Sequence, residues 1–284
     1  MNLYSIETGN FKLDGGAMFG VVPKSLWEKT NPPDELNRIK MSARSLLIED
    51  DNKLILIDTG LGNKQSEKFF SHFSLWGDFS LEKSLAHYGF SKDDITDVFL
   101  THLHFDHCGG AIEKNSNGKL SLAFKNAKYW SNHDHWNWAK NPNEREKASF
   151  LNENILPIEK SGKLQLLDSP KDSLFKNSPL KFDILFVDGH TEKQMLPVIK
   201  YKNETIVFAG DLIPTVGHLP IPYIMSYDTK PLISLKEKTS FLDLAEKNSY
   251  LLFMEHDPNN ELISLKKTEK GVRLDDSFTL KTYF

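Results

Sequence analysis

Directly after the apolar run at residues 98–100, four side chains that can bind a metal ion lie within a span of six residues: His102, His104, Asp106 and His107. Imidazole and carboxylate groups suit Zn²⁺ and similar divalent ions, and a strand that ends in a loop can bring them to one point. Gly109 and Gly110 then permit backbone conformations that other residues resist. Since packing alone gives no reason for this composition, we expect a fold in which a buried strand ends at a metal site.

Short apolar runs rich in β-branched residues indicate the framework around this segment. Their length and their lack of alternation are typical of buried strands with both faces covered. Residues 49–53, between the first two runs, have the composition of a hairpin turn. The expected strands lie at residues 45–48, 54–57, 98–100, 184–187, 205–209 and 250–254.

Helical patterns fall between these runs. The first expected helix has an apolar face formed by Leu81, Leu85 and Tyr88. Ser80 can serve as its N-cap, and Gly89 lies just past its C-terminal end. A second helix is expected at residues 235–247, where Ser234 and Glu237 have the spacing of a capping box. Strands that alternate with helices indicate an α/β layered fold.

Composition excludes several classes of protein. The 284 residues include 35 basic and 39 acidic side chains, a formal net charge of −4, which disfavours a dedicated nucleic-acid binder. The longest purely apolar run, residues 250–254, is far shorter than the ~20 residues that cross a bilayer. The N-terminus lacks the basic and apolar regions of a signal peptide. With a single cysteine, Cys108, the chain fits a reducing compartment, so we expect a cytoplasmic protein with no nucleic-acid or membrane partner.

The segment from His102 to His107 resembles the H-x-H-x-D-H motif of the metallo-β-lactamase superfamily, and four further matches occur in the family's order. They are Asp58-Thr59-Gly60 for its D-T-G turn, Gly189-His190-Thr191 for its G-H-T, Gly210-Asp211 for its G-D, and His256 after a strand. The resemblance implies a four-layer αβ/βα sandwich, with two mixed sheets flanked by helices. It also implies one domain over residues 1–284, because ligands so far apart in sequence must meet in one cleft.

The resemblance implies two divalent metal ions, expected to be Zn²⁺, with Asp211 bridging them and Asp58 as a supporting partner. One ion would be held by His102, His104 and His190, and the other by Asp106, His107 and His256. Aspartate rather than cysteine at position 211 suits a two-metal hydrolase. Histidine rather than an acidic residue at position 104 points away from the di-iron flavoprotein branch.

The expected reaction is hydrolysis by a metal-bridging hydroxide, because a water held between two metal ions has its pKa lowered towards ~7. The hydroxide would attack a carbonyl carbon or a phosphorus atom whose oxygen is polarised by one metal ion. Asp106 is expected to carry a proton to the leaving oxygen.

Flanking segments at residues 12–20 and 125–130, and around Asp211 and Asp228, look like the lineage of N-acyl homoserine lactone lactonases and methyl parathion hydrolase. This resemblance predicts a quorum-quenching lactonase acting on a small lactone or ester, with phosphotriesterase or aryl-esterase side activity. Pro214 stands where the best-known lactonases have a tyrosine that contacts the lactone carbonyl. His218 or Tyr223 could take over that contact, so both are candidate catalytic residues.

Two aromatic loops have two interpretations. Residues 16–27 and 219–225 could wall an apolar pocket for an acyl chain. Alternatively, they cover the core or form the contact of a homodimer. A preference for long acyl chains would favour the pocket.

Other functions are compatible with the same residues. They are a glyoxalase II-like thioesterase, another metal-dependent ester or phosphoester hydrolase including a nuclease, an iron dioxygenase, and a non-catalytic metal-binding protein. No basic stripe supports a nuclease, and no distinctive basic C-terminal motif supports the thioesterase.

Two other features near the motif are interpreted as structural. His133 and His135 form a second H-x-H, but they belong to an expected aromatic-rich helix entry at residues 129–138. Cys108 occupies a position that the family motif does not use, which favours a small packed thiol.

Overall fold

The computed structural model describes all residues from Met1 to Phe284, which divide into two compact units. Unit 1 consists of Met1–Asn10 and Ala43–Lys171, and unit 2 of Phe11–Ser42 and Asp172–Phe284. The chain passes from unit 1 into unit 2 within strand β1 (Asn2–Asp14) and returns within strand β2 (Arg38–Asp50). None of the helices combines the length and the apolar composition that spanning a bilayer requires.

Unit 1 is built on a mixed sheet in the order β1-β2-β3-β4-β7-β8. β2 and β3 form an antiparallel hairpin, and the pairs from β3 to β8 are parallel. The remaining strands are β3 (Lys53–Ile57), β4 (Asp97–Phe99), β7 (Lys128–Asn132) and β8 (Leu164–Leu167), with a separate hairpin of β5 (Ile112–Lys114) and β6 (Leu120–Leu122). The α-helices are α3 (Glu67–Phe73), α4 (Leu81–His87), α5 (Phe105–Cys108), α6 (His133–Lys140) and α7 (Asn152–Lys160).

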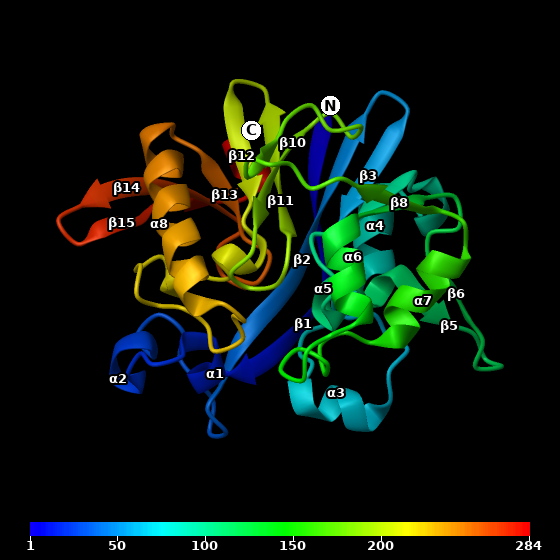
Figure 1. The fold of residues 1–284 in the computed structure, drawn as a ribbon, viewed down its shortest axis with the longest axis horizontal. Helices are drawn as coiled ribbons and strands as arrows, with labels where there is room; N and C mark the ends of the chain where they lie inside the picture. The colour runs from blue at the N-terminus through cyan, green and yellow to red at the C-terminus, as the bar shows by residue number, and fades with distance from the viewer. The chain divides into compact units, whose positions relative to one another are not determined.

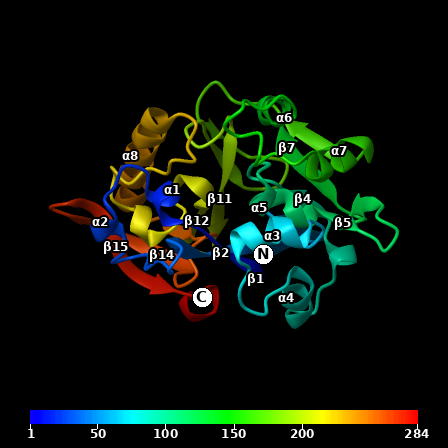
Figure 2. The same ribbon diagram turned by 90° about the horizontal axis from the view of Figure 1, so that it is seen from below.

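The core of unit 1 lies between this sheet and its helices. Leu85 of α4, Trp136 of α6 and Ile155 of α7 belong to one apolar cluster with Leu56 of β3 and Val98 of β4. α6 and α7 lie side by side in both views (Figures 1 and 2). Burial of this apolar surface holds β4 firmly, and β4 is the strand that leads into the ligand-rich segment.

Unit 2 is built on a mixed sheet in the order β15-β14-β13-β12-β11-β10-β9, in which only β12 and β13 are parallel. The strands are β9 (Leu174–Phe175), β10 (Asp183–Val187), β11 (Gln194–Tyr201), β12 (Glu204–Phe208), β13 (Leu251–Phe253), β14 (Leu262–Thr268) and β15 (Gly271–Phe278). The helices are α1 (Gly15–Phe19), α2 (Lys24–Trp27), α8 (Pro231–Lys247) and α9 (Leu280–Tyr283), with short 3₁₀ turns η3 (Gly210–Leu212) and η4 (Val216–His218).

Helix α8 covers one face of the unit 2 sheet (Figure 1). Its buried residues Phe241, Leu242 and Ala245 pack in one apolar cluster with Val207 of β12 and Leu252 of β13. Since β12 and β13 run in parallel, the loops that follow them begin at the same edge of the sheet.

The predicted α/β fold of two mixed sheets flanked by helices is confirmed. Each expected strand lies within or overlaps an observed one, namely β2, β3, β4, β10, β12 and β13. The helix predicted after Ser80 is confirmed as α4, because the Ser80 side chain accepts the Lys83 N–H and Gly89 follows the helix with φ 83°.

Two predicted boundaries are wrong. α8 begins at Pro231, not at residue 235, because proline is favoured at the first helical position. Ser234 and Glu237 therefore lie inside the helix and form no capping box. Residues 129–132, expected in a helix entry, belong to strand β7, and α6 starts only at His133.

Candidate metal centre

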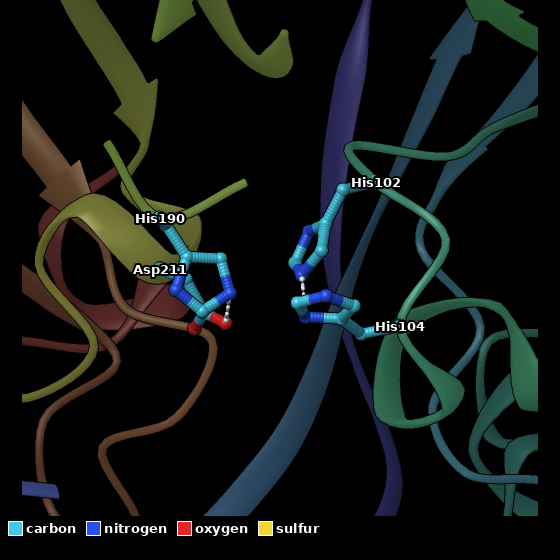
Figure 3. A group of neighbouring side chains, drawn as sticks. All are labelled: His102, His104, His190 and Asp211. Atoms are coloured by element: carbon cyan, nitrogen blue, oxygen red, sulfur yellow. Dashed lines mark hydrogen bonds and ion pairs between the residues drawn. The ribbon is translucent and has the colours of Figure 1, made fainter. Parts of the chain in front are cut away.

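The half of the candidate site in unit 1 follows β4, which lies between β3 and β7 in the sheet. The loop after β4 carries His102 and His104, and the single turn of α5 carries Asp106 and His107. All four side chains are buried. His102 Nε2 lies 3.1 Å from His104 Nδ1 (Figure 3), while His107 Nε2 lies 3.7 Å from an Asp106 oxygen. Such a concentration of buried nitrogen and oxygen atoms is suited to a cation.

Asp58 organises this half. Its fully buried carboxylate accepts the Thr101 N–H at 2.8 Å, the Thr101 hydroxyl at 2.6 Å and a proton on His107 Nδ1 at 3.0 Å. Asp58 has φ 57°, a conformation that costs a non-glycine residue free energy. Because Nδ1 of His107 is committed to Asp58, a metal ion would bind His107 through Nε2. The predicted supporting role of Asp58 therefore has a direct geometric basis.

The two glycines after the motif are needed for a close approach, not for an unusual φ. A Cβ on Gly109 would lie 2.1 Å from the Leu61 carbonyl oxygen, and one on Gly110 would lie 2.2 Å from the Thr59 carbonyl oxygen. Thr59 itself donates its N–H and its hydroxyl to the His107 carbonyl. The turn after β3 is thus fixed to the end of α5 by these hydrogen bonds.

Leu103, between the two histidines of the loop, is held at both of its peptide groups. Its N–H donates to Nε2 of the buried His135 at 2.9 Å, and its carbonyl accepts the Cys108 thiol at 3.3 Å. Burial raises the pKa of Cys108 to about 12, which keeps the thiol protonated as a donor. The prediction of a small packed thiol is confirmed, and His135 supports the backbone of the ligand loop.

The half in unit 2 is formed by residues that follow three strands: His190 after β10, Asp211 in η3 after β12, and His256 after β13. Asp211 lies between the two imidazoles, with one oxygen 2.9 Å from His190 Nε2 (Figure 3) and the other 3.0 Å from His256 Nε2. The outer nitrogens also have acceptors. His190 Nδ1 lies 3.0 Å from Asp228, and His256 Nδ1 lies 2.8 Å from the Ser42 carbonyl.

The hydrogen bonds of His190 and His256 show that the donor atoms around Asp211 fit a metal ion. His256 must carry its proton on Nδ1 to donate to a carbonyl, so a neutral ring turns the lone pair of Nε2 towards the Asp211 carboxylate. A cation between the two groups removes that repulsion. Burial lowers the pKa of His190, but Asp211 and Asp228 outweigh burial and raise it to about 10. Positive charge therefore stabilises this cluster, and a divalent ion would supply it.

The chain carries two buried groups of His and Asp residues that could hold metal ions. In unit 1 they are His102, His104, Asp106 and His107, and in unit 2 they are His190, Asp211 and His256. His133 and His135 belong to none of these groups.

His218 is buried and uses both ring nitrogens within unit 2. Nε2 donates to the Met18 carbonyl at 2.9 Å, and Nδ1 accepts the Thr215 hydroxyl at 2.8 Å. Burial, with the nearby Lys238, lowers the pKa of His218 to about 3, so the ring is neutral. The predicted contact between His218 and a substrate carbonyl would require the hydrogen bond to Met18 to break.

Tyr223 differs from His218 in that its hydroxyl makes no hydrogen bond within the chain. The side chain is partly buried, and its ring lies edge-on to Phe19 with centroids 6.2 Å apart. Phe19 also stacks on Trp27, at 5.2 Å. These two rings are buried in unit 2, as the core-cover interpretation expects, whereas Val21 is 96% exposed.

Comparison with known proteins places this geometry in context. A family model described as metallo-beta-lactamase superfamily matches residues 40–256, a stretch that includes parts of both units. No curated protein sequence matches the chain.

Solved structures are similar over almost the whole chain. A probable metal-dependent hydrolase from Staphylococcus aureus is 29% identical, with a TM-score of 0.87 over 98% of this chain and 96% of the other. AidC, a dizinc quorum-quenching lactonase in complex with a product, is 26% identical, with a TM-score of 0.78 over 98% of this chain and 95% of the other. The hydrolase AbOPH shares the fold at 19% identity, with a TM-score of 0.77 over 97% and 94%.

The hydrogen bond from Leu103 to His135 predicts a stability change. His135→Phe keeps an aromatic ring but leaves the buried Leu103 N–H without an acceptor, which should cost about 1–3 kcal/mol of unfolding free energy. Urea unfolding of the full chain measures this. His133→Phe, on the exposed side of the same helix, is the matched control and should stay within about 0.5 kcal/mol of the parent. Equal losses of stability in the two variants would contradict the role of His135 as the acceptor for the Leu103 N–H.

The Asp58 contacts predict a change in metal affinity. In Asp58→Asn the side chain can no longer accept from all three donors, so His107 is less firmly oriented and metal affinity should fall about 10–100-fold. Competition with a chelator for Zn²⁺ measures the change. Asp134→Asn, at an exposed position of α6, provides the control. An unchanged affinity in Asp58→Asn would show that His107 needs no such support.

Proposed function

Because this chain belongs to the metallo-beta-lactamase superfamily and is a metal-dependent hydrolase, we propose that it opens lactone rings of the N-acyl homoserine lactone type and so acts in quorum quenching. The observation that carries this proposal is the similarity, over nearly the full length of both chains, to a dizinc lactonase bound to its ring-opened product. The proposed partner is accordingly a small lactone.

We propose two divalent ions, expected to be Zn²⁺, with the ligands that the family motif implies. One is held by His102, His104 and His190, the other by Asp106, His107 and His256, and Asp211 bridges them. The two carboxylate oxygens of Asp211 support this assignment. One lies beside His190, proposed for the first ion, and the other beside His256, proposed for the second. The fixed Nδ1 atoms of His107 and His256 support binding through Nε2.

When bound, the ions would supply a Lewis acid for the lactone carbonyl and a nucleophilic water at neutral pH. Their charge would exceed that of Asp106 and Asp211, so the site favours a developing oxyanion although the whole chain has a net charge of −4.

The remaining steps fall to side chains of the protein. The Asp106 carboxylate is proposed to take a proton from the attacking water and to deliver it to the ring oxygen as the C–O bond breaks, which balances the hydrolysis. Tyr223 is proposed to donate a hydrogen bond from its hydroxyl to the lactone carbonyl, because Pro214 stands where the best-known lactonases have the tyrosine that makes this contact. The lack of an internal hydrogen bond at the Tyr223 hydroxyl supports this role over that of His218.

Other predictions accompany this proposal. The cytoplasmic location, the homodimer, the single domain over residues 1–284 and the phosphotriesterase or aryl-esterase side activity stay predictions. Metal analysis tests the proposed pair of ions, because two equivalents of zinc-like metal fit the proposal and one iron does not.

A substrate panel tests the proposed activity. Metal-replete protein should hydrolyse N-acyl homoserine lactones with a higher kcat/KM than simple lactones, thioesters or phosphotriesters, and a preference for long acyl chains would support an apolar acyl pocket. Asp106→Asn is the control and should lose most activity in every assay. Faster turnover of a glutathione thioester than of any lactone would replace the lactonase proposal with the thioesterase.

The proposed carbonyl contact predicts the effect of Tyr223→Phe. Loss of one hydrogen bond to the developing oxyanion should lower kcat/KM for the lactone about 100-fold, with metal content unchanged. Tyr227→Phe, at a more exposed tyrosine of the same loop region, is the control. If Tyr223→Phe retained full activity, another group would have to contact the carbonyl.

A further inference from the structure

Two adjacent residues of helix α8, Glu237 and Lys238, bind the backbone of two different loops. The Glu237 carboxylate accepts the Asp188 N–H at 2.7 Å with one oxygen and the Gly189 N–H at 3.0 Å with the other. Lys238 Nζ donates to the Pro220 carbonyl at 2.9 Å and to the Tyr223 carbonyl at 2.8 Å. Neighbouring residues of a helix differ in direction by about 100°, so one helix can reach both loops at once.

The loop bound by Glu237 is the turn that carries His190. This turn lies directly on the first turns of α8, because a Cβ on Gly189 would come within 2.4 Å of the Ser234 nitrogen. The Lys230 N–H also donates to the Gly189 carbonyl. A carboxylate that accepts two backbone N–H groups makes stronger hydrogen bonds than a neutral side chain would. Glu237 thereby fixes the backbone immediately before a proposed metal ligand.

The loop bound by Lys238 is the turn that carries Tyr223. Lys238 is only 1% exposed, which is rare for a lysine because burial of an ammonium group is costly. Burial lowers the pKa of Lys238 to about 7, with the Asp228 carboxylate opposing this shift and Arg273 adding to it. A neutral amine still has two N–H groups, one for each of the two carbonyls.

Few hydrogen bonds within the turn fix its backbone. Prolines at 220 and 222 have no N–H to donate, and the backbone hydrogen bonds within the turn are those from Tyr223 to Pro220 and from Ile224 to Pro222. An apolar side chain at position 238 would fill the space but leave both carbonyls without these donors. Lys238 therefore orients the Pro220 and Tyr223 carbonyl groups, in addition to filling space beside the turn.

We propose that Glu237 and Lys238 are a pair of positioning residues, through which α8 holds the His190 turn for metal binding and the Tyr223 turn for substrate binding. The two tasks are separable, since each side chain contacts only one of the loops. The Tyr223 part rests on the proposed function, whereas the His190 part requires only that His190 binds a metal ion.

The test is a crossed comparison of Glu237→Gln and Lys238→Met in the full-length chain. Glu237→Gln should lower Zn²⁺ affinity about 10–100-fold in chelator competition, because an amide can accept from only one of the two N–H groups, and should leave the KM of zinc-saturated protein unchanged. Lys238→Met should leave Zn²⁺ affinity unchanged and lower lactone kcat/KM about 10–100-fold, mainly through KM.

The matched controls lie on the same helix. Glu246→Gln and Lys236→Met make the same chemical changes at positions whose side chains hold no loop, and both should behave as the parent protein. If Glu237→Gln and Lys238→Met changed metal affinity and KM to the same extent, the two residues would act only through general stability, and the proposal would be overturned.

A second readout keeps the Lys238 part independent of the substrate. Lys238→Met should increase hydrogen exchange of the backbone amides of Tyr223 and Ile224, with no increase at Asp188 and Gly189, whether or not the protein hydrolyses lactones. If Lys238→Met does not fold, Lys238→Gln, which retains an N–H donor, should give the same pattern at smaller amplitude. Unchanged exchange at Tyr223 in the folded variant would disprove the positioning role.

Discussion

Three of the candidate ligands are held by the same interaction, a hydrogen bond from the outer Nδ1 of an imidazole to a fixed acceptor. His107 donates to Asp58, His190 to Asp228, and His256 to the Ser42 carbonyl. Each bond fixes both the ring orientation and the tautomer, so that Nε2 becomes the atom that faces a cation. The surrounding fold must place these acceptors, namely a carboxylate directly after β3, a carboxylate before α8 and a carbonyl of β2, beside three separate rings.

The candidate ligands could be named from the sequence, whereas most of their hydrogen-bond partners could not. His102 to His107 form a short pattern, and the resemblance to the superfamily's motifs then selected His190, Asp211 and His256, each of which follows an apolar run. Asp228 reaches His190 across 38 residues and Ser42 reaches His256 across 214, and the latter contact uses a backbone carbonyl that no residue type reveals. Asp58 was predictable only because it belongs to a recognisable turn.

The errors in the predicted secondary structure have related causes. Ser234 and Glu237 matched a capping box, but Pro231 starts α8 earlier and leaves Glu237 available to bind the Asp188–Gly189 backbone. Strands β14 and β15 were not predicted because the prediction relied on continuous apolar runs, and adjacent charged residues such as Lys266 and Lys267 interrupt these strands. At Glu237, a residue that local rules assign to a helix cap performs another task, because its partner Asp188 lies 49 residues away in the chain.

The strands β1 and β2 make unit 2 discontinuous in sequence, which limits how such a chain can be recombined. An exchange of everything after Lys171 between two relatives would transfer His190, Asp211 and His256 together but leave Phe11 to Ser42 behind. His256 would then depend on the other relative's backbone for the hydrogen bond at Nδ1, and on that relative's residue at position 11 for the ring contact that Phe11 makes at 5.8 Å between centroids. The surroundings of the candidate ligand His256 therefore depend on the exact path of residues 11–42, although 214 residues separate Ser42 from His256.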